Sequence, residues 1–234
     1  MQFPLPLRRA TLLLRYKRFL SDHRLEDGST VTAHVANPGA MTGLTGEGSE
    51  TWLSPAANPK RKLPYSWEMV RADGGLVGVN TGWPNRLAEE AIRGGAIPSL
   101  AGYESIRREV AYGAGSRVDF LLEGADRPPC YVEVKNVHLK RGPAAEFPDS
   151  VTARGTKHLR ELAAVADTGA RAVMLYIVQR EDCESFALAA DIDPAYAAAF
   201  TEARASGVEA LAYACRLSTA GIAVDRPLPI NNTV

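Results

Sequence analysis

Two carboxylates and a lysine lie on segments of the sequence that are predicted to form neighbouring β-strands. Asp119 lies within the apolar run Arg117–Leu122, and Glu133 and Lys135 lie within Tyr131–Val137. Alternate residues of a strand share a face, so Glu133 and Lys135 point the same way, and a hairpin would let Asp119 and Glu133 converge. Two hard carboxylates suit Mg²⁺ or Mn²⁺, which also relieves their mutual repulsion. The spacing therefore predicts a divalent-metal site, with a plain surface ion pair between Glu133 and Lys135 as the alternative.

A further carboxylate comes from the preceding segment, residues 84–93, which is predicted to be a helix because a proline begins it and two glycines follow it. Its apolar face contains Leu87 and Ala91, and Glu90 borders that face. Glu89 has the three- and four-residue spacing to two arginines that is typical of solvated ion pairs. We therefore expect Glu90 to point inward and Glu89 to lie on the surface.

Basic side chains recur on the predicted helix over residues 152–166. Arg154, Lys157 and His158 are separated by three and four residues, so they share one helix face opposite the leucines. Such a face could contact a phosphate backbone. An ordinary solvated helix face is equally consistent with this pattern.

The elements that must position these side chains begin after residue 80. Helical periodicity, β-prone runs and glycine or proline breaks give an α-β-β-β-α-β order, which indicates a mixed α/β domain. The 131–137 strand, the following helix and the 173–178 strand are expected to form a right-handed parallel crossover. The predicted helices are 84–93, 152–166 and 194–205, and the predicted strands are 106–112, 117–122, 131–137, 173–178 and 208–215.

The first 80 residues have a different pattern. Short β-prone runs alternate with turn residues about every ten positions, and no helical period is present, which predicts a small barrel. Arg15, Lys17 and Arg18 interleave with Tyr16 and Phe19 in this segment. Basic and aromatic side chains on a barrel face are typical of single-stranded nucleic-acid binding. We therefore expect two domains, 1–80 and 81–234, and nucleic-acid contacts from these three basic residues.

The net charge of the chain is zero, because 27 Lys and Arg balance 27 Asp and Glu. Residues 1–72 carry 10 basic and 6 acidic residues, a net of +4, and the remainder carries 17 and 21, a net of −4. The neutral total argues against a polyanionic partner for the chain as a whole, but this division does not exclude one for the N-terminal part.

Other classes of protein are excluded by simpler features. The longest apolar runs, such as Val173–Val178, are far shorter than the roughly 20 residues of a membrane-spanning helix. Basic residues interrupt Met1–Leu20, so no signal-peptide apolar region is present. Cys130, Cys183 and Cys215 are too widely spaced for a zinc motif and are expected to be reduced. We expect a soluble, cytoplasmic protein without a membrane partner.

The order of Asp119, Glu133, Val134 and Lys135 after a helical glutamate resembles the PD-(D/E)xK nuclease motif, with Val118 where the motif has proline. Six further segments add to this pattern: Asn37–Met41, Tyr65–Met69, Pro84–Leu87, Ser116–Phe120, Tyr131–Val137 and Phe147–Leu162. In this order they resemble the bacterial sugar fermentation stimulation protein A family over nearly the whole chain.

The resemblance implies a fold and an activity. The expected fold is an N-terminal OB-fold barrel followed by a restriction-endonuclease-like α-β-β-β-α-β domain that binds DNA, with single-stranded DNA or RNA as further partners. Asp119 and Glu133 would bind Mg²⁺ or Mn²⁺, helped by the Val134 carbonyl and Glu90, for phosphodiester hydrolysis. Lys135 would orient the attacking water or stabilise the charge on the phosphate.

Two other functions remain open at the level of sequence. The first is a DNA-binding regulator of sugar (maltose) metabolism whose nuclease fold is catalytically silent. The second is a nucleotide- or RNA-processing factor that uses the same site. The intact Asp119, Glu133 and Lys135 favour an enzyme, because a pure binding protein has little reason to face two carboxylates toward phosphate.

Overall fold

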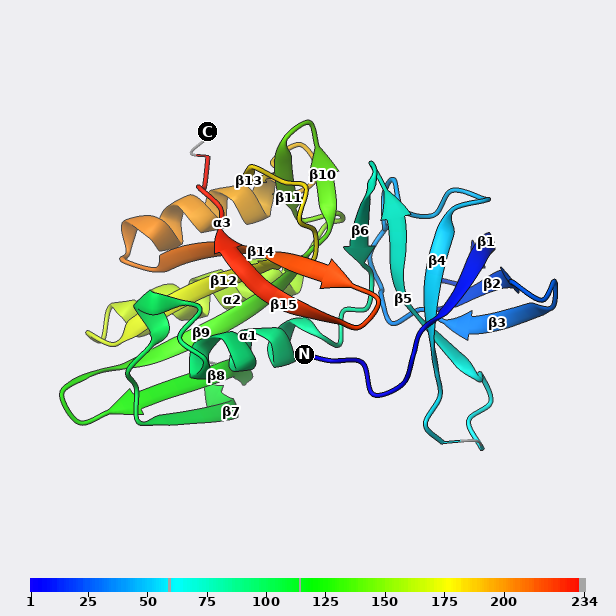
Figure 1. The fold of residues 1–234 in the computed structure, drawn as a ribbon. Helices are drawn as coiled ribbons and strands as arrows, with labels where there is room; N and C mark the ends of the chain where they lie inside the picture. Colours follow the sequence, from blue (N-terminus) through cyan, green and yellow to red (C-terminus); the bar gives the residue numbers. More distant parts are fainter. Residues whose placement is uncertain (59, 114, 232–234) are drawn as a thin grey trace.

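The computed structural model describes residues 1–58, 60–113 and 115–231. The chain forms a β-barrel and a larger mixed domain, which lie side by side in Figure 1. In the described ranges, no helix has the length and apolar character needed to cross a membrane.

The barrel contains six strands. They are β1 (Arg8–Tyr16), β2 (Leu20–Leu25), β3 (Thr30–His34), β4 (Glu50–Pro55), β5 (Tyr65–Ala72) and β6 (Gly75–Gly78). The order β3-β2-β1-β4-β5-β6, with an additional β3–β5 pairing, closes β1 to β5 into a barrel. Alternate positions fill the interior, where Leu12, Leu53 and Trp67 are fully buried. The expected OB-type barrel is confirmed.

The second domain is a three-layer α/β/α structure (Figure 1). Its central sheet has the order β15-β14-β12-β9-β8-β7. One face packs against α1 through a core that includes Leu87, Val132 and Leu175. The other face packs against α2 and α3 through a core that includes Leu159 and Tyr196. This arrangement confirms the expected mixed α/β domain.

The predicted helices and strands of this domain occur in the predicted order, and β10, β11, β13 and β15 are additional strands that were not predicted. The elements are α1 (Pro84–Arg93), β7 (Ser105–Tyr112), β8 (Ser116–Gly124), β9 (Arg127–Val137), β10 (Leu139–Arg141), β11 (Ala144–Phe147), α2 (Ala153–Ala166), β12 (Arg171–Val178), β13 (Ser185–Leu188), α3 (Pro194–Ala205), β14 (Glu209–Ser218) and β15 (Gly221–Pro227). As expected, β9 and β12 pair in parallel around α2.

Local sequence signals set the helix ends. Pro84 occupies the first turn of α1, where its missing N–H leaves no hydrogen bond unmade. The Thr152 hydroxyl caps α2 by accepting a hydrogen bond from the Gly155 N–H at 3.1 Å. The Asp193 carboxylate caps α3 by accepting from the Tyr196 N–H at 3.0 Å. The cap at Thr152 fixes the register of α2, and with it the direction in which the basic residues of that helix point.

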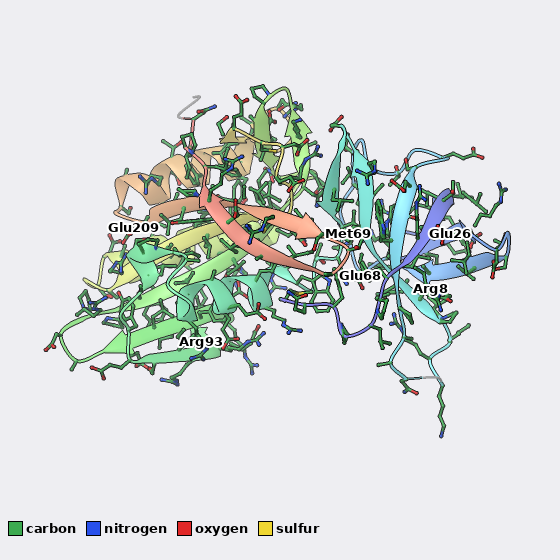
Figure 2. The ribbon with its side chains drawn as sticks, viewed as in Figure 1. Arg8, Glu26, Glu68, Met69, Arg93 and Glu209 are labelled. Atoms are coloured by element: carbon green, nitrogen blue, oxygen red, sulfur yellow. The ribbon has the colours of Figure 1, made fainter. Side chains whose placement is uncertain are left out.

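The two domains share a core and a buried polar junction. Glu68 and Met69 lie at this junction (Figure 2). Met69 packs into the core of the second domain. The buried Glu68 carboxylate accepts hydrogen bonds from Ser54 Oγ (2.6 Å), Asn80 Nδ2 (2.8 Å) and Trp83 Nε1 (2.6 Å). Because a buried carboxylate is stable only when its oxygens are paired, these bonds hold the start of the second domain against the barrel.

Candidate functional site

Strands β8 and β9 separate beside the predicted acidic residues. They pair at Leu122↔Cys130, Leu121↔Tyr131 and Phe120↔Val132. Beyond that point the Val134 N–H donates a 2.7 Å hydrogen bond to Asp119 Oδ2. A side-chain carboxylate therefore takes the place of a strand partner.

Asp119 is held on its other oxygen as well. Asp119 Oδ1 accepts a 2.7 Å hydrogen bond from Asn85 Nδ2, in the first turn of α1. Sequence reasoning missed Asn85. The available signal was the position of Asn85 directly after a helix-initiating proline. In the first turn of α1 its side chain can reach Asp119.

Glu133 forms the centre of a buried polar cluster. Lys135 Nζ donates to Glu133 Oε1 at 2.8 Å, and His158 Nδ1 from α2 contacts the same oxygen. The Arg154 Nε donates to His158 Nε2 at 3.3 Å. Since Nε2 accepts, the proton of the ring lies on Nδ1 and is donated to Glu133.

The two carboxylates differ in their readiness to lose a proton. Burial and the charge of Glu133 raise the pKa of Asp119, against hydrogen bonds from Val134 and Asn85. Burial alone would raise the pKa of Glu133, but the hydrogen bond from His158 and the charge of Lys135 outweigh it, so this pKa is lowered. Glu133 is therefore the anion that the protein itself stabilises.

The cluster fits a divalent metal with few protein ligands. Glu133 Oε2 is buried and has no hydrogen-bond partner among the described residues, and Asp119 adds further hard oxygen donors. In the described ranges, no group of three or more His, Cys, Asp or Glu side chains is arranged to hold a metal. Mg²⁺ commonly keeps several waters and uses one or two carboxylates, so the donor set suits it.

The expected inward orientation of Glu90 is wrong. Its side chain is 45% exposed, against 22% for Glu89, and it pairs with the Met1 ammonium at 2.6 Å and with Arg86 at 3.0 Å. Glu89 pairs with Arg93 and reaches Arg108 on β7. The N-terminal segment packs along β15, as the 3.0 Å bond from the Ile222 N–H to the Met1 carbonyl shows. A buried cation therefore draws Glu90 away from the sheet, which its position on the helix alone could not indicate.

The predicted basic face of α2 divides into two parts. His158 is buried against Glu133, which corrects its expected exposure beside Arg154 and Lys157. Arg154 and Lys157 remain exposed. With Arg117 of β8 and the edge of His158 they line a groove of about 350 Å³, which also contains Glu109.

Arg15, one of the barrel residues expected to bind nucleic acid, makes hydrogen bonds within the barrel instead. Its guanidinium donates to the carbonyls of Arg18, Asn37, Gly39 and Ala40 at 3.0 to 3.1 Å. It therefore fixes the β1–β2 turn against the loop that follows β3. Lys17 and Arg18 are exposed in that turn with positive φ angles of 47° and 62°.

His138 lies in the joint between the domains. It is 4% exposed, and its Nε2 is 3.1 Å from Asp149 Oδ2, which also accepts from the Met41 N–H at 3.1 Å. Its Nδ1 is 3.0 Å from Asn136 Nδ2. Both ring nitrogens are therefore occupied by structural partners.

Comparisons with known proteins agree with this geometry. Residues 82–221 match the family described as "Sugar fermentation stimulation protein RE domain", and residues 13–79 match "SfsA N-terminal OB domain". The chain is 59% identical over 233 residues to a sugar fermentation stimulation protein homolog of Paramagnetospirillum magneticum, covering 100% of this chain and 99% of that protein. A homolog from Rhodospirillum centenum is 59% identical over 232 residues, with 99% and 100% covered.

A solved structure matches the whole fold. It is that of Pyrococcus furiosus SfsA in complex with Ca²⁺, with a TM-score of 0.89 and 27% identity. The match covers 99% of this chain and 98% of that one. The arrangement of barrel and mixed domain is therefore common to both proteins.

Proposed function

The chain belongs to the sugar fermentation stimulation protein family, and from this membership and the geometry of its acidic cluster we propose that it is a nucleic-acid-binding protein that hydrolyses phosphodiester bonds with a divalent metal. The observation that carries the proposal is the convergence of Asp119, Glu133 and Lys135 where β8 and β9 separate. A surface ion pair would not bury Glu133 to 3% exposure. A buried carboxylate, Glu133, and a half-buried one, Asp119, beside a lysine support a catalytic centre.

The metal would be held by Asp119, by the unpaired Oε2 of Glu133 and by the Val134 carbonyl, with Mg²⁺ or Mn²⁺ as the working ion. The Ca²⁺ in the related Pyrococcus furiosus structure supports binding of a hard divalent cation. When bound, such an ion lowers the pKa of a coordinated water and offsets charge on the phosphate.

The side chains around the metal position each have a distinct task. Lys135 Nζ, held 2.8 Å from Glu133, donates to the attacking water or to a phosphate oxygen. His158 keeps Glu133 ionised and oriented through its Nδ1–H. Asn85 and the Val134 N–H fix the direction of the Asp119 carboxylate. Arg117 and Arg154 line the adjacent groove, where they can hold the phosphate that flanks the cleaved bond.

The barrel would supply sequence-independent affinity. Lys17 and Arg18 project from the β1–β2 turn, and Phe19, which is 44% exposed, follows them directly. Cations and an exposed aromatic ring together suit the backbone and bases of a single strand. Arg15 contributes indirectly, because it holds this turn in place.

The test is incubation of the purified full chain with labelled single- and double-stranded DNA and RNA, in Mg²⁺, Mn²⁺ or chelator. We expect metal-dependent cleavage that is lost in Lys135→Ala, with binding retained. Lys140→Ala is the matched control, because Lys140 is similarly shielded and paired, with Asp182 at 2.8 Å, but lies outside the cluster. Undiminished cleavage by Lys135→Ala would identify a contaminating nuclease and reject the site.

A DNA-binding regulator with a silent nuclease fold is the second candidate. It is favoured by one observation: Lys135 and His158 both donate hydrogen bonds to Glu133 Oε1, and Lys135 balances its charge, so part of the cluster is stable without a metal. Binding that is indifferent to chelator, without cleavage of any of the four substrates, would support this function instead.

A further inference from the structure

A groove between the two domains has no part in the site described so far. The barrel contributes its β1–β2 turn and the loop after β3, and the second domain contributes the end of β9 and the segment between β11 and α2. Its volume of about 360 Å³ is within the range of small-molecule sites. Residues on its walls include Arg18, Gly39, Asn136, Phe147, Asp149 and Val151.

The barrel wall of this groove is fixed by one guanidinium. Arg15 Nη2 donates 3.0 Å hydrogen bonds to the carbonyls of Arg18, Asn37 and Gly39, and all three residues line the groove. Arg18 has a φ of 62°, which is unfavourable for a residue with a side chain, and the bond to its carbonyl helps to hold it there. In the described part of the chain the exposed Arg18 guanidinium makes no hydrogen bond or ion pair. A cation without a partner is therefore held at the groove.

The opposite wall is joined to the barrel through Asp149. Its Oδ2 accepts a 3.1 Å hydrogen bond from the Met41 N–H and lies 3.1 Å from His138 Nε2. A Cβ on Gly39 would lie 2.5 Å from the same oxygen, so only glycine lets the barrel loop approach this closely. The two walls are thus in direct contact beside the groove, which is preformed in the folded chain.

Apolar side chains of the second domain also line the groove. Val151 is 75% exposed, the highest value among the large apolar residues that are exposed in the described ranges. Phe147 is half-buried, and its ring is held by Tyr196 and Tyr176, with centroids 5.0 and 5.6 Å away. A fixed aromatic ring and an exposed apolar side chain suit the face of a nucleobase, and the Arg18 guanidinium suits a phosphate.

Two elements connect the groove to the acidic cluster. Asn136, which lines the groove, directly follows Lys135 on β9. Thr152 lines it as well and caps α2, two residues before Arg154 in the adjacent phosphate groove. Because consecutive Cα atoms are about 3.8 Å apart, the groove begins close to the Lys135 side chain. A nucleic-acid strand at the cluster could therefore extend into the groove.

We propose that this groove holds an unpaired nucleotide of the substrate strand, with its base against Val151 and Phe147 and its phosphate at Arg18. The inference rests on the proposed function, because it names the substrate class of the same site: nucleic acid that is single-stranded beside the cleaved bond. A base inside a duplex is stacked and paired, and its removal from the stack costs free energy. A free mononucleotide has the same chemistry as one unit of the strand, so the test must separate these two ligands.

The first test is fluorescence anisotropy of the full chain in chelator, with labelled single strands and blunt duplexes of about 12 nucleotides. We expect the single strand to bind more tightly than the duplex. Val151→Asp should weaken single-strand binding about ten-fold, because a carboxylate in the groove repels phosphate and removes an apolar contact. Leu5→Asp is the matched control, since Leu5 is also an exposed apolar residue but lies outside the groove, and it should bind as wild type.

A second variant measures occupancy of the groove directly. Cys130, Cys183 and Cys215 are buried, so Val151→Cys adds an exposed thiol whose reaction with a maleimide can be followed. We expect a saturating single strand to slow this reaction about ten-fold, and the same strand to leave Leu5→Cys unaffected. Thymidine monophosphate at the same nucleotide concentration should give no protection. Equal protection by the monophosphate would assign the groove to a free nucleotide and overturn the proposal.

The outcomes separate this inference from the proposed function, because neither test measures cleavage. Undiminished binding by Val151→Asp, or an unprotected Val151→Cys thiol, would overturn the groove site, and metal-dependent cleavage lost in Lys135→Ala would still support hydrolysis. Protection of the thiol without cleavage of any substrate would support the groove site and reject hydrolysis. No binding of any nucleic acid would reject both.

Discussion

The Val134 N–H donates a 2.7 Å hydrogen bond to Asp119 Oδ2, at the point where β8 and β9 cease to pair. The carboxylate thus completes the hydrogen bonding of a strand that has lost its neighbour. The same hydrogen bond therefore marks the place where the two strands separate and fixes the position of the Asp119 side chain. Substitution at Asp119 should therefore affect folding as well as metal binding.

Asp119→Ala should lower the free energy of unfolding by about 1–3 kcal/mol, because it leaves the buried Val134 N–H without an acceptor. Asp119→Asn keeps an oxygen for that N–H, and its new NH₂ is satisfied when the Asn85 amide flips to present its oxygen, so it should lose less than about 1 kcal/mol. Both variants should lose Mn²⁺ affinity. Urea unfolding in chelator measures the first effect, and equal destabilisation by the two substitutions would contradict it.

Glu68→Gln should loosen the junction between the domains. The glutamine oxygen can still accept from Asn80 and Trp83, but the amide nitrogen then faces Ser54, whose hydroxyl must turn to accept, and the bonds lose the negative charge of the carboxylate. We expect a loss of about 1.5–3 kcal/mol in the free energy of unfolding. Glu26→Gln is the control, because Glu26 is exposed on the barrel (Figure 2). An unchanged urea midpoint for Glu68→Gln would exclude this role.

His23 should make stability depend on pH. Burial lowers the pKa of His23 to about 4, from an ordinary value of 6.5, and its ring contacts Ser21 and Thr51 inside the barrel. The unfolded chain binds a proton more readily, so this stabilisation is complete above pH 6.5 and declines as the pH falls toward 4. Urea titrations at pH 7.5 and about 5 should show the decline in wild type and a smaller one in His23→Gln. The same slope in both proteins would assign the effect to another group.

Gly113→Ala and Gly115→Ala form a matched pair in the segment between β7 and β8. Both residues have positive φ, 54° and 82°, so alanine is strained at each. A Cβ meets Glu161 at position 113, whereas nothing lies within 4 Å at position 115. We expect Gly113→Ala to be the more destabilising of the two, because its Cβ would collide with the Glu161 side chain. Equal melting temperatures of the two variants would show that this close approach does not affect stability.

Salt dependence should distinguish basic residues that touch phosphate from those that support the fold. Arg154→Ala should reduce the slope of log Kobs against log salt by about 1, because one phosphate contact is lost. Arg15→Ala should instead lower stability, since four carbonyls lose their donor. Arg216→Ala, at an arginine that is 72% exposed on β14, should change neither quantity. A reduced slope for Arg216→Ala would indicate a general charge effect.

Much of the second domain could be predicted because α1 and α2 have a helical period with clear start signals, and β12 is a continuous apolar run between turn residues. The runs around Asp119 and Glu133 alternate as strands, and this alternation also indicated which side chains share a face. Strand β2 has no apolar pattern that would identify it, because Ser21, Asp22, His23 and Arg24 are polar, although Ser21 and His23 are buried in the barrel. Burial of polar residues there depends on partners from β4, which a local pattern does not reveal.

The errors in the site have the same origin. Glu90 lies at the border of the apolar face of α1, so the sequence alone does not fix whether its side chain points inward. The N-terminal segment along β15 decides this, because the Met1 ammonium pairs with Glu90. His158 shares its spacing with Arg154 and Lys157, yet it rotates toward Glu133 because that carboxylate requires a donor. Arg15 has the charge needed to bind a phosphate, but its guanidinium already donates hydrogen bonds to nearby backbone carbonyls. In each case a contact distant in sequence decided the role of the residue.

The junction at Glu68 bears on how this architecture can be rearranged. Asn80, the last residue before the second domain, donates to Glu68, while its own carbonyl accepts from Gln179 at 3.1 Å. Division of the chain after residue 80 would expose apolar surface on both halves, because Met69 and Trp52 of the barrel form part of the core of the second domain. The barrel is therefore not expected to fold alone or to be transferable to another protein. The turn with Lys17 and Arg18 and the acidic cluster around Glu133 depend on one shared core for their stability.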